Sequence, residues 1–196
     1  MEAAIRWSPH STLDSPQFLI VDVAGNKLRL CEVESLDSKL IKYKKLCERD
    51  KLPNYTAFDW SKTEPYFVAV GSASGEANLI RIDPERYAQE ENIWSFPLKH
   101  QRKCNSIAFS PKNYLATGLE RVRNDWCMNI YDLNVISSPG PRQQEPTRKL
   151  ATSEPISSIK FFNNQPDTLV CGVTRQCIRI FDLRGMFFLL LWLILQ

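Results

Sequence analysis

Ile107-Ala-Phe-Ser-Pro111 begins the stretch of this 196-residue chain that decides its fold. An apolar run follows at Tyr114-Leu-Ala-Thr-Gly-Leu119, and a run of alternating polar and apolar residues follows at Met128-Asn-Ile-Tyr-Asp-Leu133. Alternation with a period of two is typical of a β-strand with one packed and one wetter face, whereas a helix would show a period of about 3.6. Each run is therefore predicted to form a strand.

This three-strand pattern occurs four times. In each copy the first strand ends in an aromatic residue. These residues are Trp7, Trp60, Phe109 and Phe161, and successive ones are 53, 49 and 52 residues apart. Repeats of about 40 to 50 residues built from short strands are typical of β-propeller blades, which bury their faces against one another. The sequence predicts an all-β fold, a partial β-propeller of about four antiparallel blades within residues 1–184 that does not close into a ring. The predicted blades cover approximately 4–52, 53–100, 101–151 and 152–184.

The third repeat has an unusual connection between its second and third strands. Glu120-Arg-Val-Arg-Asn-Asp-Trp126 is several residues longer than the glycine-bearing hairpin turns of the first two repeats. We expect a charged loop that projects from one face of the blade. An exposed aromatic residue flanked by arginines is typical of interface hot spots. The predicted partner contact is Arg121, Arg123, Asp125 and Trp126; the alternative is that Trp126 simply caps the blade.

Several residues resemble those of WD-repeat proteins. Tyr131-Asp132 and Phe181-Asp182 stand where these repeats place Trp-Asp, and His100 lies nine residues before Phe109, at the spacing of the family's structural histidine. The resemblance implies a buried hydrogen-bonded set that joins His100 through an aspartate to Thr117 and Tyr131. Asp125 is the local candidate for that aspartate. A buried imidazole needs such partners, since an unpaired buried polar group is costly.

More narrowly, the chain resembles the amino-terminal propeller of the Mio family over roughly residues 4–184. The residues behind this are Ile5–His10, Lys99–Pro111 and Leu115–Trp126, and the Lys-His-x-Arg-x-Cys-Asn run before the basic insertion is the distinctive part. Mio-family proteins are much longer chains, with an α-solenoid and a zinc-binding region after the propeller. The resemblance therefore implies that this chain is a fragment.

The Mio resemblance also carries a functional expectation. It implies a non-enzymatic scaffold, a subunit of the SEA/GATOR-type complex that regulates TOR signalling in response to amino acids. The implied partners are other protein subunits, and the implied location is cytoplasmic, with peripheral attachment to the vacuole or lysosome surface through those partners. A scaffold role in another WD-repeat complex is the alternative.

No catalytic residue, cofactor or metal is predicted. Gly71-Ser-Ala-Ser-Gly75 has Ala73 where a nucleophile elbow needs serine, and it lies in a strand-to-strand turn. The seven glycines form no phosphate-binding or dinucleotide-binding motif. The six cysteines include no Cys-x-x-Cys pair, and His100 with Cys104 would supply only two zinc ligands. We expect reduced, mostly buried thiols in a cytosolic protein.

The dense basic run from Lys39 to Lys51 offers an alternative function. Such a run can bind phosphates, RNA or an anionic membrane surface. However, Glu48 and Asp50 interrupt it, and no aromatic stacking platform accompanies it. The run falls where an outer edge strand is expected, and lysines on exposed edges discourage unwanted strand pairing. The net charge of +3 is also mild, so no nucleic-acid partner is expected.

Residues 185–196 lose the repeat pattern and form an aberrant apolar tail with ten consecutive apolar residues, Met186 to Leu195. A membrane-spanning helix needs about 20, so no transmembrane span is predicted. Three interpretations compete: a tail anchor, a buried strand, and translation past a wrongly assigned exon boundary. The abrupt loss of the pattern at Gly185 favours the last.

Overall fold

The structure, a computed structural model, describes most of the chain. The described residues are 3–22, 24–37, 40–50, 52, 54–85, 93–135, 145–151, 154–173 and 177–185. The predicted apolar tail beyond 185, and the residues Lys39 and Lys51 at the two ends of the basic run, lie outside them.

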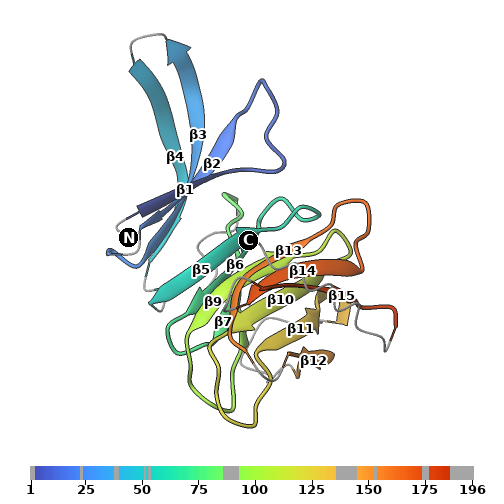
Figure 1. Cartoon of the computed structure of the whole chain (residues 1–196). Helices are drawn as coiled ribbons and strands as arrows, with labels where there is room; N and C mark the ends of the chain where they lie inside the picture. The colour runs from blue at the N-terminus through green and yellow to red at the C-terminus, as the bar shows by residue number, and fades with distance from the viewer. Residues whose placement is uncertain are drawn as a thin grey trace.

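Four antiparallel sheets follow one another along the chain, and each is made from one continuous stretch (Figure 1). We name them blades one to four. Blade one contains β1 (Ala3–Trp7), β2 (Gln17–Asp22), β3 (Lys27–Asp37) and β4 (Leu40–Arg49). Blade two contains β5 (Tyr55–Trp60), β6 (Phe67–Ser72), β7 (Ala77–Arg81) and β8 (Ile93–Phe96).

Blades three and four continue the pattern. Blade three contains β9 (Cys104–Phe109), β10 (Tyr114–Leu119), β11 (Met128–Asp132) and β12 (Arg148–Leu150), with the short 3-10 helix η1 (Leu133–Val135) after β11. Blade four contains β13 (Ile156–Phe161), β14 (Thr168–Val173) and β15 (Cys177–Asp182). Within the residues that the structure describes, none of these sheets closes on itself. The prediction of an all-β partial propeller of about four antiparallel blades is therefore confirmed.

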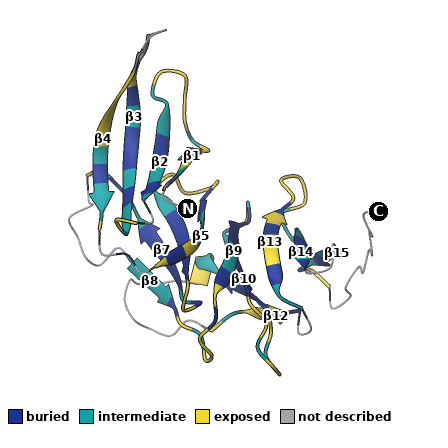
Figure 2. Ribbon diagram, turned by 60° about the vertical axis from the view of Figure 1, so that its left-hand side comes forward, coloured by how far each residue is buried: buried dark blue, intermediate teal, exposed yellow. Residues whose placement is uncertain are grey.

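Apolar residues from consecutive blades form three shared cores. Trp60 of blade two packs with Leu19, Leu28 and Leu30 of blade one. Phe109 of blade three packs in the same way with residues of blade two, and Phe161 of blade four with residues of blade three. Buried residues accordingly lie mostly along the strands, and exposed residues gather in the connecting loops (Figure 2).

Polar links between the first strands of neighbouring blades accompany this packing. The Asp59 carboxylate on β5 accepts a hydrogen bond of 2.9 Å from the backbone N–H of Phe109 on β9. The Ser106 hydroxyl oxygen on β9 accepts one of 3.0 Å from the backbone N–H of Ile159 on β13. Thr56 on β5 donates to the carbonyl of Cys104 on β9. The innermost strands therefore lie in the order β5, β9, β13, and they position the loops at the blade ends.

Candidate functional site

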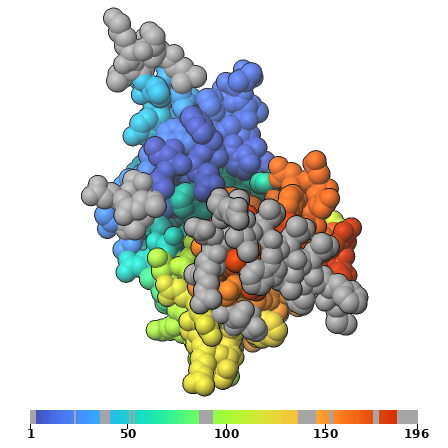
Figure 3. All heavy atoms as spheres, in the orientation of Figure 1, coloured from blue at the N-terminus to red at the C-terminus, as the bar shows by residue number. Residues whose placement is uncertain are grey.

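The long β10–β11 loop is closed by backbone hydrogen bonds at its base. The N–H of Leu119 donates to the carbonyl of Cys127 at 2.8 Å, and the N–H of Glu120 donates to that of Lys103 at 2.9 Å. Asn124 adopts a φ of 61°, a left-handed conformation that asparagine tolerates better than most residues. The loop lies at one end of the molecule in Figure 1, and the yellow atoms of this part of the chain protrude there in Figure 3.

Arg102 fixes the tip of this loop, although it is not one of the predicted site residues. Its side chain is only 3% exposed, and its Nη2 lies 3.0 Å from the Asp125 carboxylate. The same nitrogen donates a 2.6 Å hydrogen bond to the carbonyl of Trp126. The Arg102 backbone N–H donates to the carbonyl of Ser74, in the β6–β7 turn of blade two. One buried residue thus joins two blades to the loop.

One general rule points to the role of Arg102 as a partner of Asp125. Arginine is almost never fully buried unless it is paired, and Asp125 is the aspartate of the lengthened loop. The signal was weak because nothing in the sequence shows that Arg102, rather than its neighbours Gln101 or Lys103, faces inward. In the structure Gln101 and Lys103 are exposed.

The predicted contact residues are brought together on this loop. Trp126 is 40% exposed, and Arg121 and Arg123 are exposed. Asp125 is different, because both of its carboxylate oxygens are used within the protein: Oδ2 pairs with Arg102, and Oδ1 accepts a 2.8 Å hydrogen bond from the Trp126 N–H. The outward-facing part of the patch is therefore Trp126 with the two arginines.

The structure does not bring together the hydrogen-bonded set that was expected around His100. His100 is exposed, and Asp125 pairs with Arg102 instead. Thr117 and Tyr131 are buried on the neighbouring strands β10 and β11. Asn129 donates a 3.4 Å hydrogen bond to the Tyr131 hydroxyl, and burial raises the pKa of Tyr131 to about 12. The Arg102 guanidinium therefore pairs with Asp125, the aspartate that the His100 imidazole was expected to bind.

The described part of the basic run forms an outer strand whose charges are largely paired. In blade one, Lys44 of β4 lies 3.3 Å from Glu32 of β3, and Glu48 of β4 lies 2.6 Å from Arg29 of β3. The hydrogen bond from Arg29 lowers the pKa of Glu48 to about 2. Because these lysines and acids alternate across β3 and β4, the strand has no uninterrupted cationic surface.

The six cysteines form no disulfide with one another, and five of them are buried. Burial raises the pKa of Cys47 to about 11, and those of Cys104 and Cys171 to about 12. Within the described ranges, no three His, Cys, Asp or Glu side chains come together as metal ligands would. The same part of the chain holds no helix with the length and hydropathy of a membrane span.

Comparison with known proteins gives matches to one named group. No protein-family model matches the chain. It is 30% identical to the GATOR2 complex protein Mio of Drosophila melanogaster over 119 residues, which cover 60% of this chain and 13% of that protein. It is 25% identical to the GATOR2 complex protein MIOS-A of Xenopus laevis over 218 aligned positions, which cover 92% of this chain and 24% of that protein.

A third relative carries the repeat in its name. An uncharacterized WD repeat-containing protein of Schizosaccharomyces pombe is 27% identical over 135 residues, which cover 68% of this chain and 14% of that protein. The chain spans a quarter or less of the length of these three relatives. Its repeated antiparallel sheets of three or four strands and these matches together support a likeness to the WD-repeat proteins of the Mio family.

Proposed function

We propose that this chain is a non-enzymatic scaffold that holds other protein subunits within a GATOR2-type complex. Its relatives include proteins named as GATOR2 complex proteins in a fly and a frog. In this role the protein acts by surface complementarity, and no bond is made or broken. Regulation of TOR signalling in response to amino acids belongs to the same proposal. So does a cytoplasmic location at the vacuole or lysosome surface, reached through partner subunits.

The observation that carries the proposal is the geometry of the β10–β11 loop. Trp126 stands exposed on the same loop as the exposed Arg121 and Arg123, while the buried Arg102 donates a hydrogen bond to its carbonyl. Tryptophan and arginine are the residues most enriched at interface hot spots. A loop that is already fixed loses little conformational entropy when a partner binds, which favours affinity.

Copurification tests this function. The tagged chain carrying Trp126→Ala and Arg123→Ala would be recovered from cells, and its copurifying subunits would be measured by quantitative mass spectrometry. We expect at least a fivefold loss of those subunits relative to the unchanged chain. His100→Ala is the matched control, because His100 is exposed but lies off the loop. Equal recovery with the double variant and the unchanged chain would remove the loop from the interface.

A further inference from the structure

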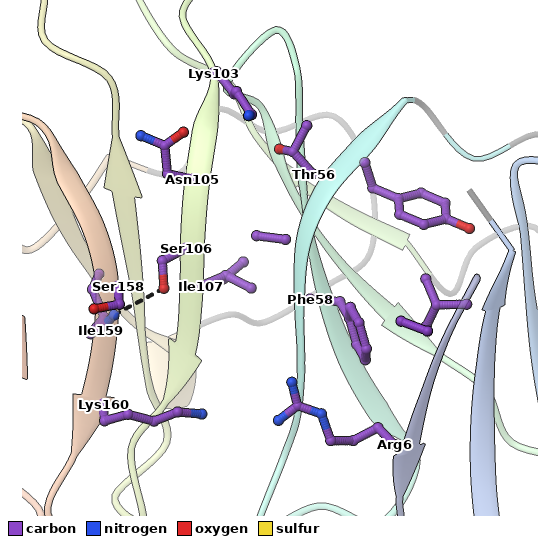
Figure 4. Close-up of a pocket in the computed structure, with 14 residues that line it drawn as sticks. Arg6, Thr56, Phe58, Lys103, Asn105, Ser106, Ile107, Ser158, Ile159 and Lys160 are labelled. Atoms are coloured by element: carbon purple, nitrogen blue, oxygen red, sulfur yellow. Dashed lines mark hydrogen bonds between the residues drawn. The ribbon is translucent and has the colours of Figure 1, made fainter. Parts of the chain in front are cut away.

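A groove of about 520 Å³ runs along the first strands of all four blades. β1 contributes Ala4 and Arg6, β5 contributes residues from Tyr55 to Phe58, and β9 and β13 form the opposite wall. Figure 4 shows these side chains converging on the space between the strands. The groove meets the base of the β10–β11 loop at Lys103, whose carbonyl accepts the N–H of Glu120, but Arg121, Arg123 and Trp126 do not belong to its lining.

The charged side chains that line this groove are all cationic. They are Arg6, Lys103 and Lys160, and no aspartate or glutamate belongs to the lining. Lys103 and Lys160 are exposed, and neither forms an ion pair with any residue that the structure describes. Arg6 lies 3.7 Å from the Asp59 carboxylate, which also accepts the N–H of Phe109. Its guanidinium lies 5.0 Å from the centre of the Phe58 ring, so it is held in place at the groove wall.

The cations are separated by an apolar middle. In Figure 4, Lys103 lies at one end of the groove, Arg6 and Lys160 lie across from each other at the other end, and Ile107 lies between. Ala57 and Ile159 also belong to this middle part of the lining. One small anion cannot contact both ends at once. The pattern instead fits an extended ligand with negative charges at its two ends and apolar groups between them.

Most polar groups on the walls are already used to hold the strands together. The Asn105 amide donates to the carbonyl of Ile156 at 3.2 Å, and the Ser106 hydroxyl oxygen accepts the N–H of Ile159 at 3.0 Å. Thr56 donates to the carbonyls of Gly71 and Cys104. These bonds brace the walls and leave Lys103 and Lys160 as cationic donors with no ion-pair partner among the described residues, while Arg6 shares its charge with Asp59.

We propose that this groove binds an acidic peptide segment in extended conformation, with carboxylates near Lys103 at one end and near Arg6 and Lys160 at the other, and apolar side chains over Ile107 and Ile159. A nucleic acid fits less well, because single strands bind through exposed aromatic platforms. Here Tyr55 is buried and the Phe58 ring is covered by Arg6.

Fluorescence anisotropy with the full 196-residue chain tests the proposal. The probe is a fluorescein-labelled ten-residue peptide with two glutamates at each end and leucine and valine between. Lys103→Ala with Lys160→Ala should weaken binding at least tenfold. The control pair Lys42→Ala and Lys149→Ala removes the same charge from exposed lysines outside the groove and should change the Kd less than twofold. Ser158→Glu, an exposed position on the groove wall, should also weaken binding by placing a negative charge in the groove.

Three further measurements decide the outcome. A peptide with glutamine in place of glutamate should bind at least tenfold more weakly, and raising the salt from about 50 to about 300 mM should weaken binding of the acidic peptide. The proposal fails if the control pair weakens binding as much as the groove pair, or if the glutamine peptide binds equally well. Displacement by inorganic phosphate or by a single-stranded RNA at lower concentration than by unlabelled peptide would also overturn it. Because every variant here leaves the β10–β11 loop intact, these results are independent of the copurification test.

Discussion

Blade one and the three later blades carry the same repeated aromatic residue in different surroundings. Trp60, Phe109 and Phe161 are 3%, 2% and 6% exposed, because each packs on the preceding blade. Trp7 is 59% exposed, and its ring lies 5.5 Å from that of Phe18 in its own sheet. The repeat therefore determines the strand and the direction of the side chain, while the neighbouring blade determines how much that side chain contributes to stability.

The largest difference is expected between Trp60→Ala and Trp7→Ala. Removing Trp60 leaves a cavity in the core shared by blades one and two, so it should lower the free energy of unfolding by about 3 to 5 kcal/mol. Trp7→Ala should cost less than about 1.5 kcal/mol, since its ring is mostly in water already. Urea unfolding followed by circular dichroism measures both. Equal losses would mean that the face of blade one bearing Trp7 is covered in solution.

A buried ion pair should differ in the same way from an exposed one at the end of the described chain. Arg102→Met leaves Asp125 without its buried partner and should cost about 2 to 4 kcal/mol. Arg184 pairs with Asp182 at 2.6 Å, but its side chain is largely exposed, so Arg184→Ala should give no measurable change. Urea midpoints of the two variants make the comparison. A larger loss for Arg184→Ala would contradict it.

Equivalent glycines on the second strands allow a sharper test. An added Cβ at Gly71 would collide with the side chain of Cys104 on the next blade, and at Gly118 with Ile156. At Gly172 the two nearest atoms to the added Cβ would be the hydroxyl oxygens of Ser158 and Ser157 on its own sheet, which can rotate away. We expect Gly71→Ala and Gly118→Ala each to cost about 1 to 3 kcal/mol through overpacking. Gly172→Ala should be tolerated, and thermal unfolding of the three variants shows whether it is.

The smallest effect is expected from alkaline pH. Burial raises the pKa of Cys104 from 9.0 to about 12. Its contribution to stability is therefore complete below pH 9 and is lost as the pH rises from 9 towards 12, because the unfolded thiol ionises first. At pH 10 the loss is about 1 kcal/mol.

A pair of cysteine variants isolates this contribution. The fall in unfolding free energy between pH 8 and pH 10 should be smaller in Cys104→Ala than in the unchanged chain. Cys31→Ala should change that fall less, because Arg29 and Lys45 oppose the upward shift in the pKa of Cys31. If Cys104→Ala shows the same pH dependence as the unchanged chain, the thiol is not buried as described.

The sequence predicted the strands well because their signals are local. Alternation and the aromatic spacing identify the first three strands of each repeat, and these depend only on neighbouring residues. Burial could not be predicted in the same way, because Trp7 and Trp60 have the same local pattern and differ only in what packs against them.

In the candidate site, too, the features that depend on local sequence could be predicted and the contacts between distant residues could not. The exposed Trp126 and its two arginines follow from the composition and length of one loop. The pairing of Arg102 with Asp125 is instead a contact between residues 23 positions apart, and the Arg102 backbone N–H is bonded separately to the carbonyl of Ser74 in a turn of blade two. His100 was assigned by its spacing alone, and spacing does not say which of several polar side chains reaches the aspartate.

Each sheet is built from a single uninterrupted stretch of the polypeptide. During synthesis, a blade can consequently form its own hydrogen bonds as soon as its last strand has left the ribosome, without waiting for distant residues. The finished blade then offers its apolar face as a template for the next. The blades would therefore assemble in the order in which they are translated. A pause by the ribosome between two repeats would leave the apolar face of the last finished blade exposed, as a surface that chaperones can bind.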